Sequence, residues 1–477
     1  MTVQPALIDG KAVLARETLD VLDPATGERL AQTTRGTAAE IDAAVDAARG
    51  ASAAWSRTPV AGRSATLRRI GELIQRDAED LAVLESSDTG KPLTQARADV
   101  AVAARYFEFY ANTVEAFYGD SLPPNGDFIA YTRHEPFGVT GHIIPWNYPL
   151  QIGCRTIAPA VAVGNCAVVK PAEDAPLSVI RVAELALEAG LPPGVLNVVP
   201  GLGEEAGDAL ARHPGIDHLA FTGSVQVGSM VAHAAADNVV PVSLELGGKS
   251  PNIVFADADV DAAVPVIVKS MLQNAGQTCS AGSRLLVHAA IYGRVLDAVA
   301  DRLRQVTIGA GTADPDLGPL ISARQRDRVT AIVERAGVGG AVQRTGPGTV
   351  TVPDRGFFFA PTLFADVDPA AEIAREEVFG PVVAATPFAT VEEALTLANG
   401  TDYGLIAAVW TTDLDTAHTM AEGIRAGQVY LNTYGAGGGV EYPFGGVKKS
   451  GYGREKGFEA LGAFCQTKAV ILKVGRA

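Results

Sequence analysis

A cysteine among small residues is the first feature of the chain that suggests chemistry. Cys279 lies in Gly276-Gln-Thr-Cys-Ser-Ala-Gly282, directly before an apolar run. A lone cysteine is most often a buried structural thiol. The flanking glycines, however, leave room for a substrate and for backbone N–H groups to approach the sulfur, as a nucleophile requires. This segment alone leaves both interpretations open.

Two further polar residues occupy positions suited to catalysis. Glu245 ends the apolar run Val242-Ser-Leu-Glu-Leu246, where a buried carboxylate is costly unless it is paired or neutralised. It is either a strand-end residue that reaches water or a general base with a raised pKa. Asn147 lies in the rigid loop Pro145-Trp-Asn-Tyr-Pro149. An asparagine there is either a turn former or a hydrogen-bond donor to a developing oxyanion.

Composition limits the class of protein. The chain has 477 residues, 47% of them hydrophobic and 19% charged, which indicates a packed globular protein of two or three domains. Its net charge of −15, without a cluster of Lys or Arg, argues against nucleic acid and anionic membranes as partners. We expect no membrane span, because the longest uncharged stretch contains three prolines.

The cysteines favour a reducing compartment. Only four occur, at Cys154, Cys166, Cys279 and Cys465, and their spacing matches neither a metal site nor a disulfide framework. The N-terminus lacks the basic start and apolar run of a signal peptide. We therefore expect a cytoplasmic protein without a bound metal.

The elements that position these residues follow from hydrophobic periodicity. Apolar spacing predicts helices over residues 38–49, 61–86 and 93–118. Short β-rich runs then alternate with helical stretches, with strands at 139–144, 165–170, 195–199, 218–221 and 242–246 and helices at 176–189, 204–212 and 225–236. This rhythm predicts an α/β fold with a doubly wound parallel sheet, which binds ligands at the carboxyl ends of its strands.

A second αβ series follows along the chain. Its strands are expected near residues 252–255, 284–288, 382–388, 406–409 and 428–432. Two lobes are therefore predicted, and the cleft between them is where we expect the chemistry.

Eight short segments follow one another along the chain: Pro145-Trp-Asn-Tyr-Pro149, Val169-Lys-Pro-Ala-Glu173, Phe221-Thr-Gly-Ser224 with Gly228, Leu244-Glu-Leu-Gly-Gly-Lys249, Gly276-Gln-Thr-Cys279, Glu377-Val-Phe-Gly-Pro381, Pro443-Phe-Gly-Gly446 and Ser450-Gly-Tyr-Gly-Arg-Glu455. In this order they resemble the aldehyde dehydrogenase superfamily nearly from end to end. The resemblance implies a Rossmann-like NAD-binding domain from residues 1–121 and 139–247 and a catalytic αβ domain from 248–445. Segments 122–138 and 446–477 would form a small bridging sheet that joins subunits, so a homodimer or homotetramer is implied.

The resemblance also implies a hydrolytic mechanism. Cys279 would attack an aldehyde, and Asn147 together with the Cys279 backbone N–H would hold the oxyanion. After hydride transfer a thioester would remain, and Glu245 would activate the water that releases the carboxylic acid. Relatives that transfer the acyl group to coenzyme A lack this glutamate, so its presence favours free acid as the product.

The cofactor residues are carried over in the same way. Lys170 and Glu173 would lie at the adenosine ribose, where a carboxylate repels a 2′-phosphate and so favours NAD over NADP. Gly223 and Ser224 open a helix that would meet the pyrophosphate, and Glu377 and Phe379 would lie at the nicotinamide end. The other expected cofactor contacts are Ile144, Trp146, Gly203, Phe221, Gly228 and Leu246.

The substrate is less closely specified. Arg155 matches an arginine found both in enzymes acting on succinate semialdehyde and in enzymes acting on benzaldehyde-type substrates, whereas Gln273 replaces the second carboxylate-binding arginine of the semialdehyde enzymes. Consecutive glycines in Tyr434-Gly-Ala-Gly-Gly-Gly-Val440 suggest a roomy pocket for an aromatic or bulky aldehyde. A succinate-semialdehyde-like or betaine-aldehyde-like substrate is the alternative. The expected pocket residues are Tyr148, Arg155, Thr278, Ser280, Gly438 and Phe444.

Three further questions stay open at this point. Thr156 stands where many relatives have a lysine of a proton relay, so Glu455 is either a relay residue or a helix-cap or surface residue. A catalytically inactive binding relative would typically lack Cys279 or Glu245, and both are present. Ester hydrolysis by the same thiol is the remaining rival activity.

Overall fold

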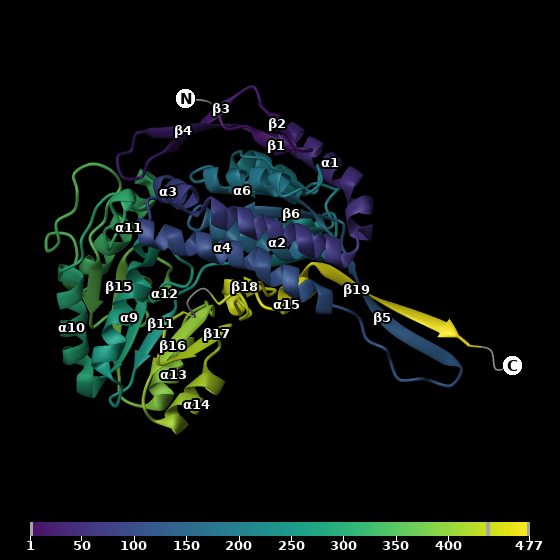
Figure 1. Cartoon of the computed structure of the whole chain (residues 1–477). Helices are drawn as coiled ribbons and strands as arrows, with labels where there is room; N and C mark the ends of the chain where they lie inside the picture. Colours follow the sequence, from purple (N-terminus) through teal and green to yellow (C-terminus); the bar gives the residue numbers. More distant parts are fainter. Residues whose placement is uncertain (1–2, 436–438, 475–477) are drawn as a thin grey trace.

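Two large sheets and a projecting arm make up the computed structural model, which describes residues 3–435 and 439–474 (Figure 1). The first sheet has eight strands in the order β18-β10-β9-β6-β7-β8-β1-β2. Its five central strands run parallel, which confirms the doubly wound α/β fold. Four of them, β6 to β9, are buried on both faces, and for that reason they appear in the sequence as mostly apolar runs. The strand bounds are β1 Ala6–Ile8, β2 Lys11–Val13, β6 Val139–Ile144, β7 Cys166–Pro171, β8 Leu196–Val198, β9 His218–Thr222, β10 Val242–Glu245 and β18 Gly451–Tyr452.

The second sheet has seven strands in the order β13-β14-β15-β12-β11-β16-β17, all parallel to their neighbours except β13. Helices flank both large sheets, so a second αβ lobe is present as expected. Its strands are β11 Pro251–Val254, β12 Arg284–His288, β13 Val342–Thr345, β14 Thr362–Ala365, β15 Val382–Phe388, β16 Ile406–Trp410 and β17 Gln428–Leu431. The domain boundaries themselves stay a prediction, and β18 lies in the first sheet, paired with β10.

Helices of the first lobe differ in length from the predictions. Helix α1 begins with a capping box at Thr37 and continues to Arg57, beyond the predicted end at residue 49. The single helix predicted over 61–86 is wrong, because α2 ends at Arg76 and α3 begins at Ala78. Between them Asp77 has a non-helical ψ of 21°, and its carboxylate pairs with Arg76 and Arg181. The helix bounds are α1 Ala38–Arg57, α2 Val60–Arg76, α3 Ala78–Thr89, α4 Leu93–Thr113, α5 Pro149–Val163, α6 Leu177–Glu188, α7 Asp208–Ala211 and α8 Val225–Ala236.

The remaining helices belong to the later part of the chain. They are α9 Val260–Leu272, α10 Tyr292–Arg304, α11 Ala323–Val338, α12 Glu372–Arg375, α13 Val391–Asn399, α14 Leu414–Gly423 and α15 Glu459–Ala463. Within the described residues, no helix is both long and apolar enough to cross a bilayer.

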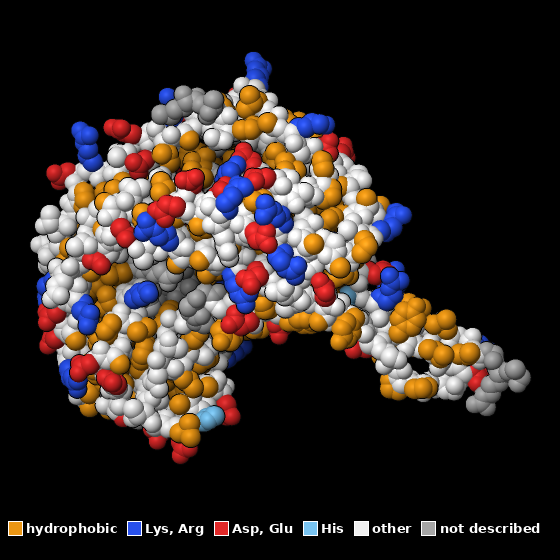
Figure 2. Space-filling view, in the orientation of Figure 1, with side chains coloured by type: hydrophobic (Ala, Val, Ile, Leu, Met, Phe, Trp, Pro, Cys, Tyr) orange, Lys and Arg blue, Asp and Glu red, His pale blue; other side chains and the backbone are white. Residues whose placement is uncertain are grey.

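The arm consists of β5 Phe128–Pro136 and β19 Cys465–Lys473. The two strands pair antiparallel from Phe128↔Lys473 to Pro136↔Cys465, and the pair projects away from both lobes (Figure 1). Apolar side chains cover much of its visible face (Figure 2). A further small sheet pairs β3 Thr18–Leu22 with β4 Arg29–Thr34.

Candidate active site

The loop that carries Cys279 joins α9 to β12 through an unusual backbone. Asn274, Ala275 and Gly276 have φ angles of 49°, 54° and 71°, in the left-handed region. Only glycine fits at 276, because a Cβ there would lie 2.1 Å from the carbonyl oxygen of Gly380. Cys279 is half-buried, and burial raises the pKa of its thiol to about 12, although the Arg155 guanidinium acts to lower it. The resting thiol is therefore protonated at neutral pH.

Glu245 ends β10 inside the protein rather than in water. It is 3% exposed, and neither carboxylate oxygen has a hydrogen-bond partner. Burial raises the pKa of Glu245 well above its usual value, and the carboxylate of Glu455 raises it further, while Arg155, Arg454 and Lys456 act to lower it. A buried carboxyl group held at a raised pKa is what a general base needs near neutral pH.

Asn147 lies between β6 and α5, at the carboxyl end of the first sheet. Its Nδ2 donates a hydrogen bond to the backbone carbonyl of Gln277 at 3.0 Å, which joins it to the loop of Cys279. The two loops come from different lobes, and they meet because parallel strands end at the same edge of each sheet.

A cleft of about 790 Å³ contains all three residues predicted to be catalytic. Asn147, Glu245 and Cys279 line it together with five of the predicted cofactor contacts, namely Trp146, Gly223, Ser224, Glu377 and Phe379. The other predicted cofactor residues do not line this cleft: Ile144, Lys170, Glu173, Gly203, Phe221, Gly228 and Leu246.

Lys170 and Glu173 lie beside the cleft. The ammonium group of Lys170 is 2.8 Å from a carboxylate oxygen of Glu173. Burial acts to raise the pKa of Glu173, but Lys170 and the backbone N–H of Gly203 outweigh it, so the pKa is lowered and the carboxylate stays ionised. Asp174, next along the chain, pairs at 3.6 Å with Arg324, which lines the cleft.

The first turn of α8 fits a phosphate group. Ser224 is its N-cap and accepts a hydrogen bond from the backbone N–H of Val227. Helix N-termini attract anions through their free N–H groups. Gly228 lets this helix lie close to the sheet, since a Cβ there would lie 2.5 Å from a methyl group of Leu246.

Glu377 and Phe379 line the cleft from the second lobe. Glu377 accepts a hydrogen bond from the backbone N–H of Gly248 at 2.9 Å, and burial raises its pKa to about 7. Phe379 has a φ of 57° and packs edge-on against Trp146, with ring centroids 5.3 Å apart. Arg328 and Gln325 of α11 donate hydrogen bonds to the backbone carbonyls of residues 377–379. Sequence reasoning missed these two α11 residues, because they belong to no motif.

Phe444 brings charged groups close to Cys279. It packs with Leu405 and Ile406 in a cluster that Cys279 also touches. The Arg155 guanidinium carbon lies 5.1 Å from the centre of the Phe444 ring, and the Lys456 ammonium lies 5.2 Å from it. Two cations therefore flank one aromatic side chain beside the nucleophile.

Arg155 and Glu455 form an ion pair, and each side chain is 4% exposed. Of the alternatives left open for Glu455, the surface role is wrong, because its side chain is buried against Arg155 on α5, about 300 residues earlier in the chain. Thr156 donates a hydrogen bond to the carbonyl of Gly153 and brings no charge.

The other predicted pocket residues differ in how close they lie to the nucleophile. Thr278 and Ser280 flank it and join their hydroxyl groups at 3.1 Å, while Tyr434 donates to the carbonyl of Ser280 at 2.6 Å. Tyr148 is buried, with the Lys91 ammonium 4.2 Å from the centre of its ring. Gly438 lies outside the described residues. No group of three metal-ligating side chains occurs in the described part of the chain.

Comparisons with known proteins place this chain in a family. Residues 13–470 match the model of the aldehyde dehydrogenase family. A hydroxyisobutyraldehyde dehydrogenase of Mycolicibacterium austroafricanum is 42% identical, over 98% of this chain and 94% of that one. Among solved structures, the NAD⁺ complex of an aldehyde dehydrogenase from Bacillus cereus has a TM-score of 0.97 and 40% identity, over 99% of this chain and 97% of that one. Betaine aldehyde dehydrogenase from Staphylococcus aureus, also with NAD⁺, has a TM-score of 0.96 and 37% identity, over 99% and 95%.

The chain belongs to the aldehyde dehydrogenase family. It is an oxidoreductase that acts on an aldehyde group and uses NAD. The residues on and beside the cleft fit that cofactor: the ionised Glu173 beside it for ribose hydroxyls, and on it the N-terminus of α8 for the pyrophosphate and Glu377 with Phe379 for the nicotinamide end.

Proposed function

We propose that Cys279, Asn147 and Glu245 oxidise an aldehyde to the free carboxylic acid through a thioester. The observation that carries the proposal is that all three line one cleft with five of the predicted cofactor residues, and that the Glu245 carboxylate is buried without a hydrogen-bond partner. The thiol proton of Cys279 passes to a water molecule in the cleft, and the thiolate sulfur attacks the aldehyde carbon. The carbonyl oxygen becomes an oxyanion, to which Asn147 Nδ2 and the Cys279 backbone N–H donate.

Collapse of that adduct expels the hydride from the former aldehyde carbon and leaves a thioester on Cys279. Bound NAD supplies the acceptor for this hydride at its nicotinamide ring. Glu245 then takes a proton from a water molecule, whose oxygen attacks the thioester carbon. The C–S bond breaks, Glu245 passes its proton to the leaving thiolate, and the carboxylic acid leaves, so that the Cys279 thiol and the Glu245 carboxylate are both restored.

We propose an uncharged aromatic or bulky aldehyde as the substrate. The support is the ion pair of Arg155. The carboxylate of Glu455 balances the charge of the Arg155 guanidinium, so this arginine has less tendency to bind a substrate carboxylate. Gln273 provides no second arginine. Succinate semialdehyde and betaine aldehyde remain the alternatives, and Lys456 is the cation that would have to hold an acidic substrate.

NAD rather than NADP is proposed as the physiological oxidant. The ionised carboxylate of Glu173 would repel a 2′-phosphate at the adenosine ribose. We also propose that the protein acts in the cytoplasm, since its four cysteines are unpaired.

Pairing of arms between subunits is proposed to build a homodimer or homotetramer. The arm exposes Ile129, Tyr131, Ile471 and Leu472, of which Ile471 is 67% exposed. A long pair of strands with apolar side chains in water favours a partner.

One set of kinetic measurements tests the mechanism and the substrate. NADH formation is followed in rapid mixing with benzaldehyde-type, medium aliphatic, betaine and succinate-semialdehyde substrates, and with NADP in place of NAD. Cys279→Ala is expected to abolish NADH formation. Glu245→Gln is expected to give one equivalent of NADH per site and then stall, with turnover down about 10²-fold or more. Turnover retained in either variant would contradict the mechanism, and a preference for succinate semialdehyde would contradict the substrate proposal.

A further inference from the structure

Asn274 has a conformation and a set of contacts that the mechanism above does not use. It is 1% exposed, and its φ and ψ of 49° and 42° place it in the left-handed region, followed there by Ala275. Side chains with a Cβ rarely adopt this conformation, and asparagine tolerates it best. A buried, left-handed residue five positions before the nucleophile is a feature that the surroundings must hold in place.

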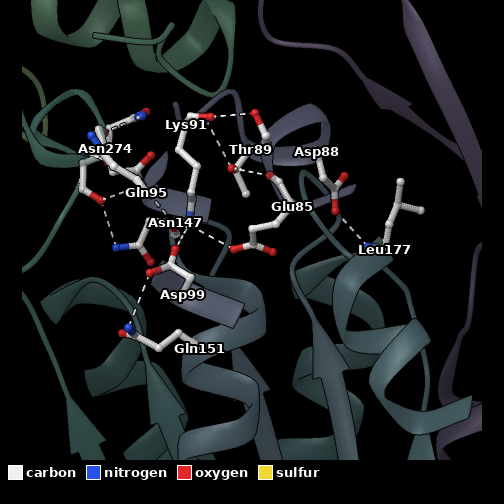
Figure 3. A network of polar contacts seen from close by, with 12 residues as sticks. Glu85, Asp88, Thr89, Lys91, Gln95, Asp99, Asn147, Gln151, Leu177 and Asn274 are labelled. Carbon is white, nitrogen blue, oxygen red and sulfur yellow. Dashed lines mark hydrogen bonds and ion pairs between the residues drawn. The ribbon is translucent and has the colours of Figure 1, made fainter. Parts of the chain in front are cut away.

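The Asn274 amide joins the two loops of the site. Its Nδ2 donates to the backbone carbonyl of Asn147 at 2.8 Å and to that of Gln277 at 3.3 Å. The Asn147 amide donates to the same Gln277 carbonyl at 3.0 Å. Figure 3 shows the side chains of Asn274 and Asn147 next to each other. The side-chain amides of Asn274 and Asn147 therefore converge on the carbonyl oxygen of Gln277, and the Asn274 amide also binds the backbone carbonyl of Asn147.

These contacts determine how Asn147 is oriented. A carboxamide nitrogen carries two hydrogens in one plane. With one of them on the Gln277 carbonyl, and with the Asn147 backbone held by Asn274, the direction of the second hydrogen is set before a substrate binds. Donors that are oriented in advance are what stabilises a developing oxyanion.

Asn274 is itself held from two sides. Its backbone N–H donates to the side-chain carbonyl of Gln95 on α4 at 2.8 Å. Its backbone carbonyl accepts from the backbone N–H and the side-chain amide of Gln277, at 2.9 and 3.1 Å. The first of these contacts ties the nucleophile loop to the helices of the first lobe.

The helices of the first lobe that border this contact are held together by a buried ion cluster (Figure 3). The Lys91 ammonium contacts Glu85 at 2.9 Å and Asp99 at 2.6 Å, and Asp99 also accepts a hydrogen bond from Gln151 of α5 at 3.4 Å. Helices α4 and α5 thus meet at the start of α5, directly after the loop of Asn147. The Asn147–Asn274 contact lies between two supported elements.

We propose that Asn274 is a positioning residue that holds Asn147 in place as the oxyanion donor. It does not touch substrate; it acts through Asn147. The inference rests on the proposed function, because it needs Asn147 to serve the oxyanion and Cys279 to be the nucleophile.

Asn274→Gly is the principal test. Glycine accepts the left-handed backbone and keeps the hydrogen bonds of the backbone N–H and carbonyl, so the variant removes the side-chain amide alone. The rate of the NADH burst is expected to fall about tenfold to a hundredfold, as for a displaced oxyanion donor. The Kd for NAD is expected to stay within about twofold of the wild type. A burst rate within about twofold of wild type would overturn the inference.

Asn274→Asp is a second test, with Asn197→Asp as its matched control. Asn274→Asp places a carboxylate oxygen opposite two carbonyl oxygens, so it is expected to slow the burst at least as much as Asn274→Gly. Asn197 is a fully buried asparagine whose Nδ2 donates to the carbonyl of Gly194 at 2.8 Å, away from the cleft. Asn197→Asp should lose stability but keep the burst rate per folded active site, which is determined by titrating the active-site thiol. Equal slowing in both variants would overturn the inference.

A double-mutant cycle separates positioning from general structural support. If Asn274 acts through Asn147, Asn274→Gly should have no further effect on the burst in the Asn147→Ala background. Multiplicative losses would overturn the inference. Should Asn274→Gly fail to fold, Gln95→Met removes the acceptor of the Asn274 N–H and is expected to slow the same burst; a wild-type burst rate in that variant would overturn it.

The cycle also distinguishes the inference from the proposed function. If Asn147→Ala itself keeps the wild-type burst, the oxyanion role of Asn147 and the role of Asn274 fail together. If Asn147→Ala is slow and Asn274→Gly is not, the mechanism stands and only the positioning role is wrong.

Discussion

At the scale of single residues, the sequence predicts which chemical groups are present but not which side chains they contact. The motifs predicted Cys279, Glu245 and Asn147, and the structure brings the three to one cleft. They do not reveal that Arg155 pairs with Glu455, because that pairing depends on packing between α5 and a segment near the C-terminus. Asn274 was missed for a similar reason. Its contacts with Asn147 and Gln95 link segments that lie far apart in the chain.

The charges around Glu245 lead to a prediction about pH. The Glu245 carboxyl must be ionised to activate water, and Lys456 acts to lower its pKa. Lys456→Met removes that positive charge, so the pKa of Glu245 rises further and a smaller fraction is ionised at pH 7. Hydrolysis of the acyl-enzyme is expected to slow about threefold or more at pH 7 and to recover at higher pH.

Rapid-quench measurement of acid release across pH 6–9 checks this expectation, which concerns the deacylation phase only. Lys269, exposed on α9, offers a matched control as Lys269→Met, which should leave the profile unchanged. A Lys456→Met profile that overlies the wild type, or one displaced to lower pH, would contradict the electrostatic role of Lys456.

At the scale of elements, periodicity predicted the parallel strands well and the N-terminal part poorly. Strands β6, β7, β8 and β9 are buried on both faces and so appear as apolar runs. The strands β1 to β4 are short, and three of them have mostly exposed or half-buried side chains, so no clear pattern of either period marks them. The break between α2 and α3 depends on Asp77 and on ion pairs with Arg76 and Arg181, one of which comes from a distant helix.

The junction of α3, α4 and α5 leads to a prediction about stability. Lys91 is fully buried between Glu85 and Asp99, so Lys91→Met would leave two carboxylates in the interior without a cation. Breaking a buried ion pair in this way is expected to lower the free energy of unfolding by about 3–5 kcal/mol. Chemical denaturation at pH 7 measures the change.

Two comparisons make this result specific to the buried charges. Lys11 pairs with Asp9 at the surface with 76% of its side chain exposed, so Lys11→Met should cost less than about 1 kcal/mol. Burial raises the pKa of Asp99 to about 6 although Lys91 acts to lower it, so in Lys91→Met this pKa is higher still, and the deficit should shrink as the pH is lowered from 8 toward 6. If Lys91→Met lowers the free energy of unfolding at pH 7 by no more than Lys11→Met does, the buried cluster contributes little to stability.

At the scale of the whole molecule, the two lobes complete the site and the arm is free to join subunits. The cleft needs β10 and α8 from one lobe and the loops of Cys279 and Glu377 from the other. The arm takes no part in the cleft. It exposes apolar side chains away from both lobes (Figure 2), which is the arrangement expected of a surface that is covered by another copy of the chain.

A paired substitution on the arm tests that assembly without unfolding the arm itself. Ile129 and Leu472 face each other across the two strands and are 54% and 48% exposed. In Ile129→Glu/Leu472→Lys the new charges are opposite in sign, so they support pairing within the arm while the apolar surface is lost. The wild type is expected to sediment as a dimer or tetramer, and the variant to shift at least tenfold toward smaller species at equal concentration. Val338→Glu, at a site 93% exposed on α11, should leave the assembly unchanged. A monomeric wild type, or a variant that assembles as tightly as the wild type, would contradict the role of the arm.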